Sequence, residues 1–177
     1  IAPIMSVLQE HFGVETAMMS TVHGYTADQN LQDGPHRDLR RARAAAENII
    51  PTTTGAAVAT TEAIPELQGI FDGLAIRVPV PTVSLSDVTA VLMREVTIEE
   101  INDAFVKASK EDRYKGILTT TKVPLVSSDF IGNTYSAIVD LSLTNVVNQT
   151  MVKVIGWYDN ETGYSMRLIE MAEKFVK

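Results

Sequence analysis

The chain has 177 residues, which is enough for one domain with a sizeable hydrophobic core but short for two. Its net charge of −7 argues against nucleic acid as a general partner, and no apolar run approaches the ~20 residues that would span a bilayer. The chain contains no cysteine, which excludes disulfides and thiolate metal sites and is compatible with a cytoplasmic location. We therefore expect a globular protein that binds neither nucleic acid nor membrane.

The first predicted elements are a helix and a buried strand. Apolar residues between Ile4 and Phe12 have the spacing of one helical face, and Gly13 ends that helix. The next ten residues, VETAMMSTVH, read as a mostly buried strand that ends at His23. His23 is thus expected at a strand end, where a loop begins.

Residues 24–56 form a long connection that is rich in turn-forming and charged residues. Its one helical candidate is RRARAAAE, residues 40–47. A connection of this length inside a compact domain is usually either functional or disordered. Because Ile49 and Ile50 near its end require burial, we expect an ordered, functional loop.

The rest of the chain contains more strands than helices. A helix over residues 97–110 opens with the capping box of Thr97 and Glu100, and an amphipathic helix is predicted over residues 165–177. In the strand LAIRVPV, Leu74, Ile76, Val78 and Val80 alternate on one face and Arg77 lies on the other. The predicted strands are residues 74–80, 83–93, 116–121, 135–143 and 151–159. Strands that follow one another favour an α+β fold, with a mixed, largely antiparallel sheet and helices packed on one face.

His23 is the first candidate for chemistry, although a single histidine is more often a hydrogen-bonded structural residue than a base. It has no cysteine in this chain to activate. No set of His, Asp and Glu has metal-ligand spacing, so no metal site is expected. The sequence also lacks a G-x-G-x-x-G segment after a strand and a P-loop, and so carries no nucleotide-phosphate fingerprint of its own.

An anion site has better support from residue types. Guanidinium groups, threonine hydroxyls and a backbone N–H beside glycine together can bind a phosphate or a carboxylate. The residues of these types are Arg37, Arg40, Arg41, Arg43, Arg77, Thr52, Thr53, Thr54 and Gly55. The arginines could equally pair with Asp33, Asp38 and Glu47 on a solvated surface, and the pattern alone leaves both possibilities open.

Five long segments carry a family resemblance: TVHGYTADQ, DGPHRDLRRARAAAENIIPTTTGAA, RVPVPT, PLVSSDFIG and WYDNETGYS. In this order they resemble the catalytic half of phosphorylating glyceraldehyde-3-phosphate dehydrogenases, and the resemblance covers essentially the whole chain. It implies that residues 1–177 are a single catalytic domain of an NAD- or NADP-dependent enzyme of glycolysis. That enzyme converts glyceraldehyde 3-phosphate, the dinucleotide and inorganic phosphate to 1,3-bisphosphoglycerate through a cysteine thioester.

The same resemblance assigns roles to individual residues. It implies that His23 is the thiol-activating base, and that the thiol belongs to a Cys-Thr-Thr-Asn motif expected just before the segment IAPIM. It implies Thr26 and Arg77 for the substrate phosphate, with Arg41 shared, and Thr54 and Gly55 for inorganic phosphate. Asn160 resembles the residue that holds the nicotinamide carboxamide, and Tyr158 and Tyr164 resemble tyrosines of that pocket.

The resemblance also implies partners. The intact enzyme is expected to be a homotetramer, and residues 157–177 are expected to pack on an NAD-binding domain that this chain lacks. Without that domain and the thiol, the chain alone is expected to be inactive. The alternative is a stand-alone, non-catalytic module for oligomerisation or phosphate binding.

Overall fold

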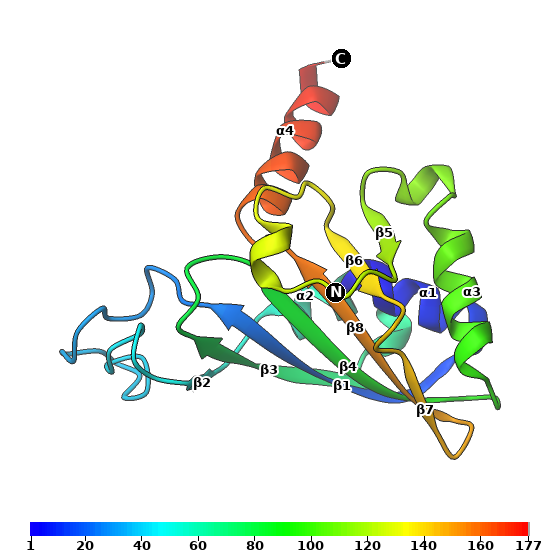
Figure 1. The fold of residues 1–177 in the computed structure, drawn as a ribbon, viewed down its shortest axis with the longest axis horizontal. Helices are drawn as coiled ribbons and strands as arrows, with labels where there is room; N and C mark the ends of the chain where they lie inside the picture. Colours follow the sequence, from blue (N-terminus) through cyan, green and yellow to red (C-terminus); the bar gives the residue numbers. More distant parts are fainter. Residues whose placement is uncertain (177) are drawn as a thin grey trace.

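An open sheet of eight strands forms the centre of the chain, of which the computed structural model describes residues 1–176. The strands are β1 (Val14–Gly24), β2 (Ile50–Thr52), β3 (Phe71–Val78), β4 (Ser84–Leu92), β5 (Leu118–Thr121), β6 (Ala137–Asp140), β7 (Asn145–Val147) and β8 (Met151–Tyr158). Their order is β2-β3-β1-β4-β8-β6-β5, with β7 also paired to β8 (Figure 1). The pairs β1–β3 and β5–β6 are parallel and the others antiparallel, which confirms the predicted α+β fold with a mixed, largely antiparallel sheet.

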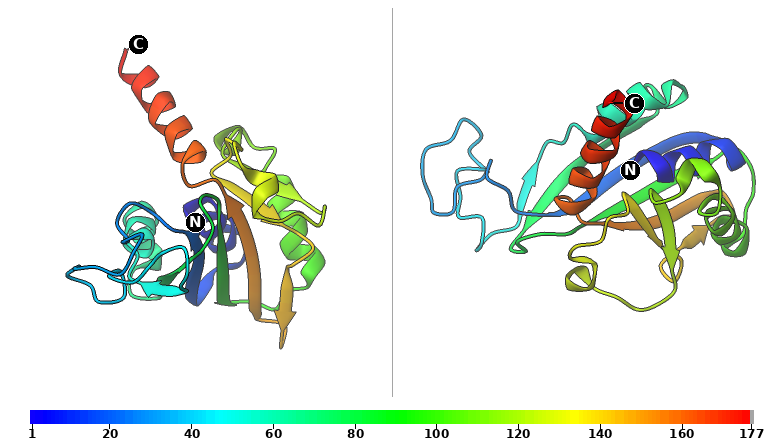
Figure 2. Two further views of the ribbon diagram at one scale, coloured as in Figure 1. Left: turned by 60° about the vertical axis from the view of Figure 1, so that its left-hand side comes forward. Right: turned by 90° about the horizontal axis from the view of Figure 1, so that it is seen from above.

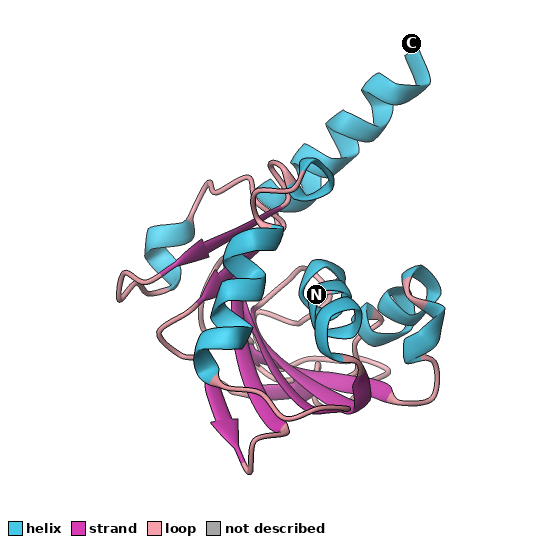
Figure 3. Cartoon of the chain, turned by 90° about the vertical axis from the view of Figure 1, so that its right-hand side faces the viewer, coloured by secondary structure: helices cyan, strands magenta, loops and turns pink. Residues whose placement is uncertain are grey.

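Three helices pack on one face of this sheet. These are α1 (Ala2–Phe12), α2 (Ala56–Ala63) and α3 (Ile98–Ala108). A further helix, α4 (Thr162–Val176), follows β8, and short 3-10 helices lie at Pro65–Leu67, Asp112–Tyr114 and Ser127–Phe130. The three helices lie over one side of the strands (Figure 3). Apolar residues of α1, α2 and α3 share one buried cluster with residues from β1, β4, β6 and β8. The capping box predicted for α3 is present: Thr97 N–H donates to Glu100 Oε2 (2.8 Å), and Glu100 N–H donates to Thr97 Oγ1 (3.2 Å).

The opposite face of the sheet is open over β1 and β3. In β1, Met19 is buried on the helix-covered face, whereas the neighbouring Met18 is 64% exposed. In β3, Ala75 is buried and Leu74 is exposed. Leu74, Ile76 and Val78 do share one face, as predicted, but it is the open one, because Arg77 pairs with His23 in the sheet and both lie on the helix-covered side.

A second, smaller apolar cluster covers part of the open face near β6 and β8. Val83, Phe130 and Ile138 are buried there, and the rings of Phe130 and Trp157 stack with centroids 5.1 Å apart. Val83 adopts φ of 72°, an unusual conformation for a β-branched residue, immediately before β4. The chain therefore turns sharply just before it enters the strand that borders β1.

The long connection after β1 is ordered by hydrogen bonds between residues far apart in the loop. Ala45 N–H donates to Asn30 O (2.9 Å), and the Asp33 carboxylate accepts from Ala44 N–H (2.9 Å). The helix predicted over residues 40–47 is wrong, because these backbone groups bond across the loop and the segment forms turns instead. The loop extends away from the sheet beyond β2 (Figure 2). Ile50 is buried as predicted, but Ile49 is exposed.

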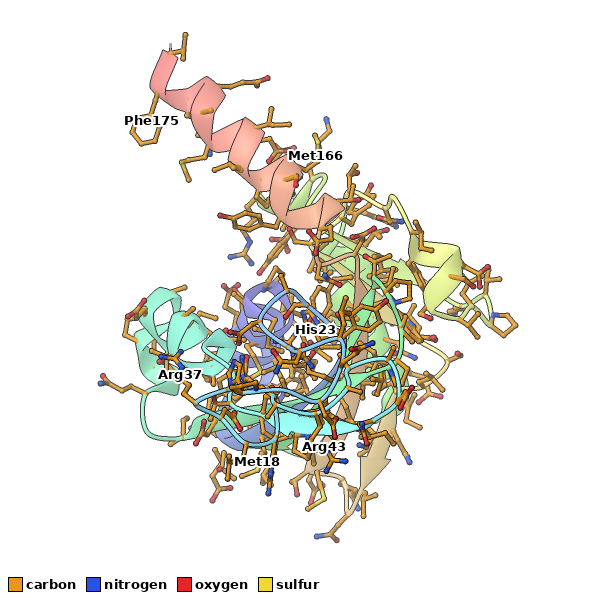
Figure 4. All side chains as sticks on the ribbon, turned by 90° about the vertical axis from the view of Figure 1, so that its left-hand side faces the viewer. Met18, His23, Arg37, Arg43, Met166 and Phe175 are labelled. Atoms are coloured by element: carbon orange, nitrogen blue, oxygen red, sulfur yellow. The ribbon has the colours of Figure 1, made fainter. Side chains whose placement is uncertain are left out.

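α4 projects away from the sheet (Figures 1 and 2). Its first turn is held by Asp159, whose Oδ1 accepts from Glu161 N–H and Thr162 N–H, both at 2.9 Å. The rest of the helix exposes apolar side chains, among them Leu168, Met171 and Phe175, the last of which stands clear of the body (Figure 4). Among the described residues, no helix is both long and apolar enough to cross a membrane.

Candidate active site

A polar cavity of about 190 Å³ lies at the end of β1, on the helix-covered face. Sheet register brings its central residues together: His23 of β1 pairs with Arg77 of β3 on one side and with Ser84 of β4 on the other. The cavity is lined by Ile1, Met19, Thr21, His23, Thr54, Ala56, Ala75, Arg77, Ser86 and Tyr158. Three of the predicted site residues, His23, Thr54 and Arg77, therefore meet in one place, at the end of β1 where the long loop begins.

His23 is half-buried and its Nδ1 has two close neighbours. The Gly24 carbonyl oxygen lies 2.6 Å away and Arg77 Nη1 lies 2.5 Å away. Burial lowers the pKa of His23 below its usual value; the Gly24 hydrogen bond acts in the opposite sense, and the positive charge of Arg77 adds to the lowering. The imidazole is consequently neutral near pH 7, which is the form that a general base requires.

Tyr158 packs edge-on against His23, with ring centroids 6.1 Å apart. Thr21 Oγ1 donates to Leu85 O (3.2 Å), so the 2.8 Å contact between Tyr158 OH and Thr21 Oγ1 is a hydrogen bond donated by the tyrosine. Thr21 therefore fixes the tyrosine ring beside the imidazole. The sequence analysis did not identify Thr21 or Ser86. Ser86 could have been identified from its strand, because Ser84 and Ser86 place hydroxyls two residues apart on a face of β4 that is otherwise apolar.

Arg77 has no carboxylate partner among the described residues. Its Nη1 contacts His23 Nδ1 and donates to Gly24 O (3.3 Å), and its buried Nε has no hydrogen-bond partner in that part of the chain. Burial, and secondarily the positive charge of Arg41, lower the pKa of Arg77. A guanidinium with an unpaired N–H and a second cation nearby is suited to bind an anion.

Arg41 is in a different situation. It forms ion pairs with Asp28 and with Asp38 (Nε to Oδ2, 3.3 Å), and its Nη2 donates to Thr53 O (3.3 Å). It lines a neighbouring cavity of about 360 Å³ rather than the cavity at His23. The surface pairing left open by the sequence also occurs, between Arg43 and Asp33 (2.9 Å), both well exposed.

Thr54 and Gly55 lie where α2 begins. Thr54 lines the cavity at His23, and its Oγ1 accepts from Ala56 N–H (3.2 Å). Gly55 is the residue before the helix, and its backbone conformation is one that any residue can adopt. Thr26 is not part of the cavity lining: its N–H and its Oγ1 both donate to Gln29 Oε1, at 2.9 and 3.2 Å.

Asn160 and Tyr164 follow β8 along the chain. Ser84 Oγ donates to Asn160 Oδ1 (3.0 Å), which holds the amide at the sheet end that carries His23. An amide held in this way can pair with the carboxamide of a nicotinamide ring. Tyr164 is exposed on α4 and does not line the cavity, whereas Tyr158 does. Within residues 1–176, no group of three or more His, Asp or Glu side chains is arranged to hold a metal ion.

Comparison with known proteins identifies the family of this chain. Residues 1–160 match the family model described as "Glyceraldehyde 3-phosphate dehydrogenase, C-terminal domain". The chain is 55% identical over 172 residues to a glyceraldehyde-3-phosphate dehydrogenase of Geobacillus stearothermophilus, covering 97% of this chain and 51% of that protein. It is 55% identical over 171 residues to one of Streptomyces coelicolor, covering 97% of this chain and 51% of that protein. It is 53% identical over 171 residues to one of Mycobacterium avium, covering 97% of this chain and 50% of that protein.

The chain thus spans about half the length of the curated relatives it matches. The family model matches residues 1–160, and the identity to the Geobacillus protein extends over 97% of this chain. The chain belongs to the glyceraldehyde 3-phosphate dehydrogenase family, whose C-terminal domain it matches.

Proposed function

We propose that this chain is the catalytic half of an NAD-dependent, phosphorylating glyceraldehyde-3-phosphate dehydrogenase of glycolysis. The whole protein oxidises glyceraldehyde 3-phosphate with NAD, or NADP, and inorganic phosphate to 1,3-bisphosphoglycerate. One observation carries the proposal: a neutral imidazole, His23, shares a small cavity with Arg77, a guanidinium without a carboxylate. The names of the relatives support it.

In this proposal His23 moves two protons. A cysteine N-terminal to Ile1 supplies the nucleophile, and its side chain enters the cavity that Ile1 lines. His23 first takes the thiol proton, because the thiolate is the form that adds to the aldehyde. The imidazolium gives this proton to the oxygen of the adduct as the hemithioacetal forms, and the neutral His23 later takes the hydroxyl proton of the hemithioacetal as hydride leaves and the thioester forms. Inorganic phosphate then attacks the thioester carbonyl, thiolate leaves, and the product is an acyl phosphate.

Two anions must be held for this sequence. Arg77 and Thr26 bind the phosphate of the substrate, and Thr54 with the Gly55 backbone binds inorganic phosphate. Arg41 contributes to both once it exchanges a carboxylate partner for a phosphate oxygen. The unpaired Nε of Arg77 supports this assignment.

The dinucleotide accepts the hydride when it is bound. Asn160 holds its carboxamide and so determines which ring face meets the substrate, and Tyr164 contributes to the same pocket. Residues 157–177, of which the structure describes 157–176, pack against the NAD-binding half of the whole protein. The exposed apolar side chains of α4 support this packing, because apolar patches of that kind are usually covered in the functional assembly.

The whole protein is a cytoplasmic homotetramer, and the open face of the sheet is one of its subunit contacts. Met18, Leu74 and Met151 are exposed on that face. A cavity of about 270 Å³ on the same side is lined largely by valines, with Leu85 and Trp157. An apolar surface next to such a cavity suits contact with another subunit.

The experiment that tests the function is an assay of NADH formation by the whole protein with glyceraldehyde 3-phosphate and inorganic phosphate. We expect His23→Asn to lower kcat by about 10²–10⁴-fold, the usual contribution of a general base. His11→Asn, on the exposed side of α1, is the matched control and should keep full activity. A whole protein that binds phosphate but forms no NADH would replace this proposal by the phosphate-binding module.

A further inference from the structure

The hydroxyl of Ser84 is buried and donates to a single side chain. Ser84 is 2% exposed, and its Oγ lies 3.0 Å from Asn160 Oδ1. Within residues 1–176 this hydroxyl makes no other hydrogen bond, so nothing else in that part of the chain competes for its hydrogen. A buried hydroxyl fixes its partner more firmly than a surface hydroxyl would, because water does not compete for the bond.

Glu161 determines which end of the Asn160 amide faces Ser84. Asn160 Nδ2 donates to Glu161 Oε1 (3.3 Å), and a carboxylate can only accept a hydrogen bond. The nitrogen of the amide is therefore turned to Glu161 and the oxygen to Ser84. Each contact uses one bond of its atom, so the amide keeps one N–H and one oxygen lone pair for a ligand. A nicotinamide carboxamide offers the matching acceptor and donor.

The backbone around Asn160 is held without help from Ser84. Asp159 is 3% exposed, and its Oδ1 accepts from Glu161 N–H (2.9 Å). Its Oδ2 accepts from Gly132 N–H (2.8 Å), in the loop before β6. The turn after β8 would therefore keep its shape if the Ser84 hydroxyl were removed, and only the Asn160 amide would be released.

Sheet register ties this amide to the proposed base. Ser84 of β4 pairs with His23 of β1 on one side and with Tyr158 of β8 on the other, so the three side chains share the helix-covered face. Neighbouring strands lie about 4.8 Å apart, so the residue that holds the Asn160 amide is one strand away from the imidazole. A nicotinamide ring paired with this amide would have its position fixed by the same strands that fix the base, and such fixed geometry between reacting groups raises the rate of a reaction.

We propose that Ser84 is a positioning residue for the dinucleotide: by holding the Asn160 amide, it places the nicotinamide ring relative to His23. This inference rests on the proposed function, in which Asn160 binds the carboxamide, and deepens it. In this role Ser84 touches neither the dinucleotide nor the substrate and acts only through Asn160. Its removal should therefore affect use of the dinucleotide and leave binding of glyceraldehyde 3-phosphate unchanged.

The test is a double-mutant cycle in the whole protein, with NADH formation as the assay. Ser84→Ala removes one oxygen atom and should lower kcat/KM for NAD by about 3–10-fold, the usual contribution of one hydrogen bond. KM for glyceraldehyde 3-phosphate should stay the same. In the Asn160→Ala protein, Ser84→Ala should have no further effect on kcat/KM for NAD, because the side chain through which Ser84 acts is gone.

Thr144→Ala is the matched control. Thr144 is also buried, and its Oγ1 donates to the side-chain oxygen of another asparagine, Asn102 (2.7 Å). Losing that hydroxyl should lower the free energy of unfolding in urea, as Ser84→Ala does, but should leave kcat/KM for NAD unchanged. The control thus separates a general loss of stability from a loss of dinucleotide positioning.

Two outcomes contradict the proposal in different ways. If Ser84→Ala lowers kcat/KM for NAD equally with and without the Asn160 side chain, or lowers it in neither protein, Ser84 does not position the dinucleotide through Asn160. If Asn160→Ala itself leaves kcat/KM for NAD unchanged, the role of Asn160 in the proposed function is wrong, and the inference fails with it.

Discussion

Arg77 and Arg41 are two guanidiniums of the same molecule with opposite surroundings. Arg41 lies in the long loop between two carboxylates, Asp28 and Asp38. Arg77 lies on β3, where its described partners are a carbonyl oxygen and an imidazole. The difference indicates that the loop arginine already has its charge compensated by the fold, whereas the strand arginine is left for a ligand to compensate. Each prediction below tests that contrast.

The largest effect is expected on anion binding when Arg77 is removed. Losing one partner of a desolvated charge pair costs about 2 kcal/mol or more, so Arg77→Met should weaken binding of a phosphate monoester such as glycerol 3-phosphate by about 30-fold or more. Isothermal titration of the chain with this monoester measures the loss. An affinity that stays within about threefold of the wild type would remove Arg77 from the anion site.

The same arginines should differ in their effect on stability. Arg41→Met leaves two carboxylates without their partner and should lower the free energy of unfolding by about 1–3 kcal/mol, less than for a fully buried pair because both aspartates are partly exposed. Arg77→Met removes a buried positive charge that has no carboxylate partner among the described residues, so it should raise the free energy of unfolding by about 1 kcal/mol. Urea unfolding of both variants tests this, and a loss of stability in Arg77→Met would contradict the contrast.

His23 should make stability depend on pH. Its pKa is lowered in the folded chain, so near and just below the unfolded value of about 6.5 the unfolded chain binds more protons. The contribution of His23 to the free energy of unfolding is therefore present above about pH 6.5 and is lost as the pH falls through the lowered pKa of the folded chain. His23→Gln should lose less stability than the wild type between about pH 7.5 and about pH 5.5. Equal losses in the two proteins would show that burial does not disfavour the imidazolium.

The smallest effect is expected at Arg43. Its pair with Asp33 is well exposed on both sides, and such pairs contribute about 0–1 kcal/mol. Arg43→Ala should leave phosphate affinity unchanged and stability within about 1 kcal/mol of the wild type. A marked loss of phosphate affinity would mean that the exposed arginines of the loop, and not Arg77, attract the anion.

Features that depend on neighbouring residues could be predicted from the sequence. The capping box of Thr97 and Glu100 is one, because both partners lie within one helical turn and their hydrogen bonds need nothing else from the fold. Of the residues that line the cavity, His23, Thr54, Arg77 and Tyr158 could be named from the family resemblance. His23 and Arg77 lie side by side because β1 and β3, two strands separated by the long loop, pair in parallel.

Features that depend on distant residues could not be predicted. The helix expected over residues 40–47 is replaced by turns because Asn30 and Asp33 accept backbone hydrogen bonds from Ala45 and Ala44. Alternation in β3 groups Leu74 with Ile76, yet a period of two does not state which face the helices cover. The bond from Ser84 to Asn160 likewise joins two segments that only the sheet brings together.

The most direct test of the account is a crystal structure of this chain grown with inorganic phosphate. We predict a phosphate in the cavity that His23, Thr54 and Arg77 line. A structure in which phosphate binds only to the exposed arginines of the long loop would contradict this prediction.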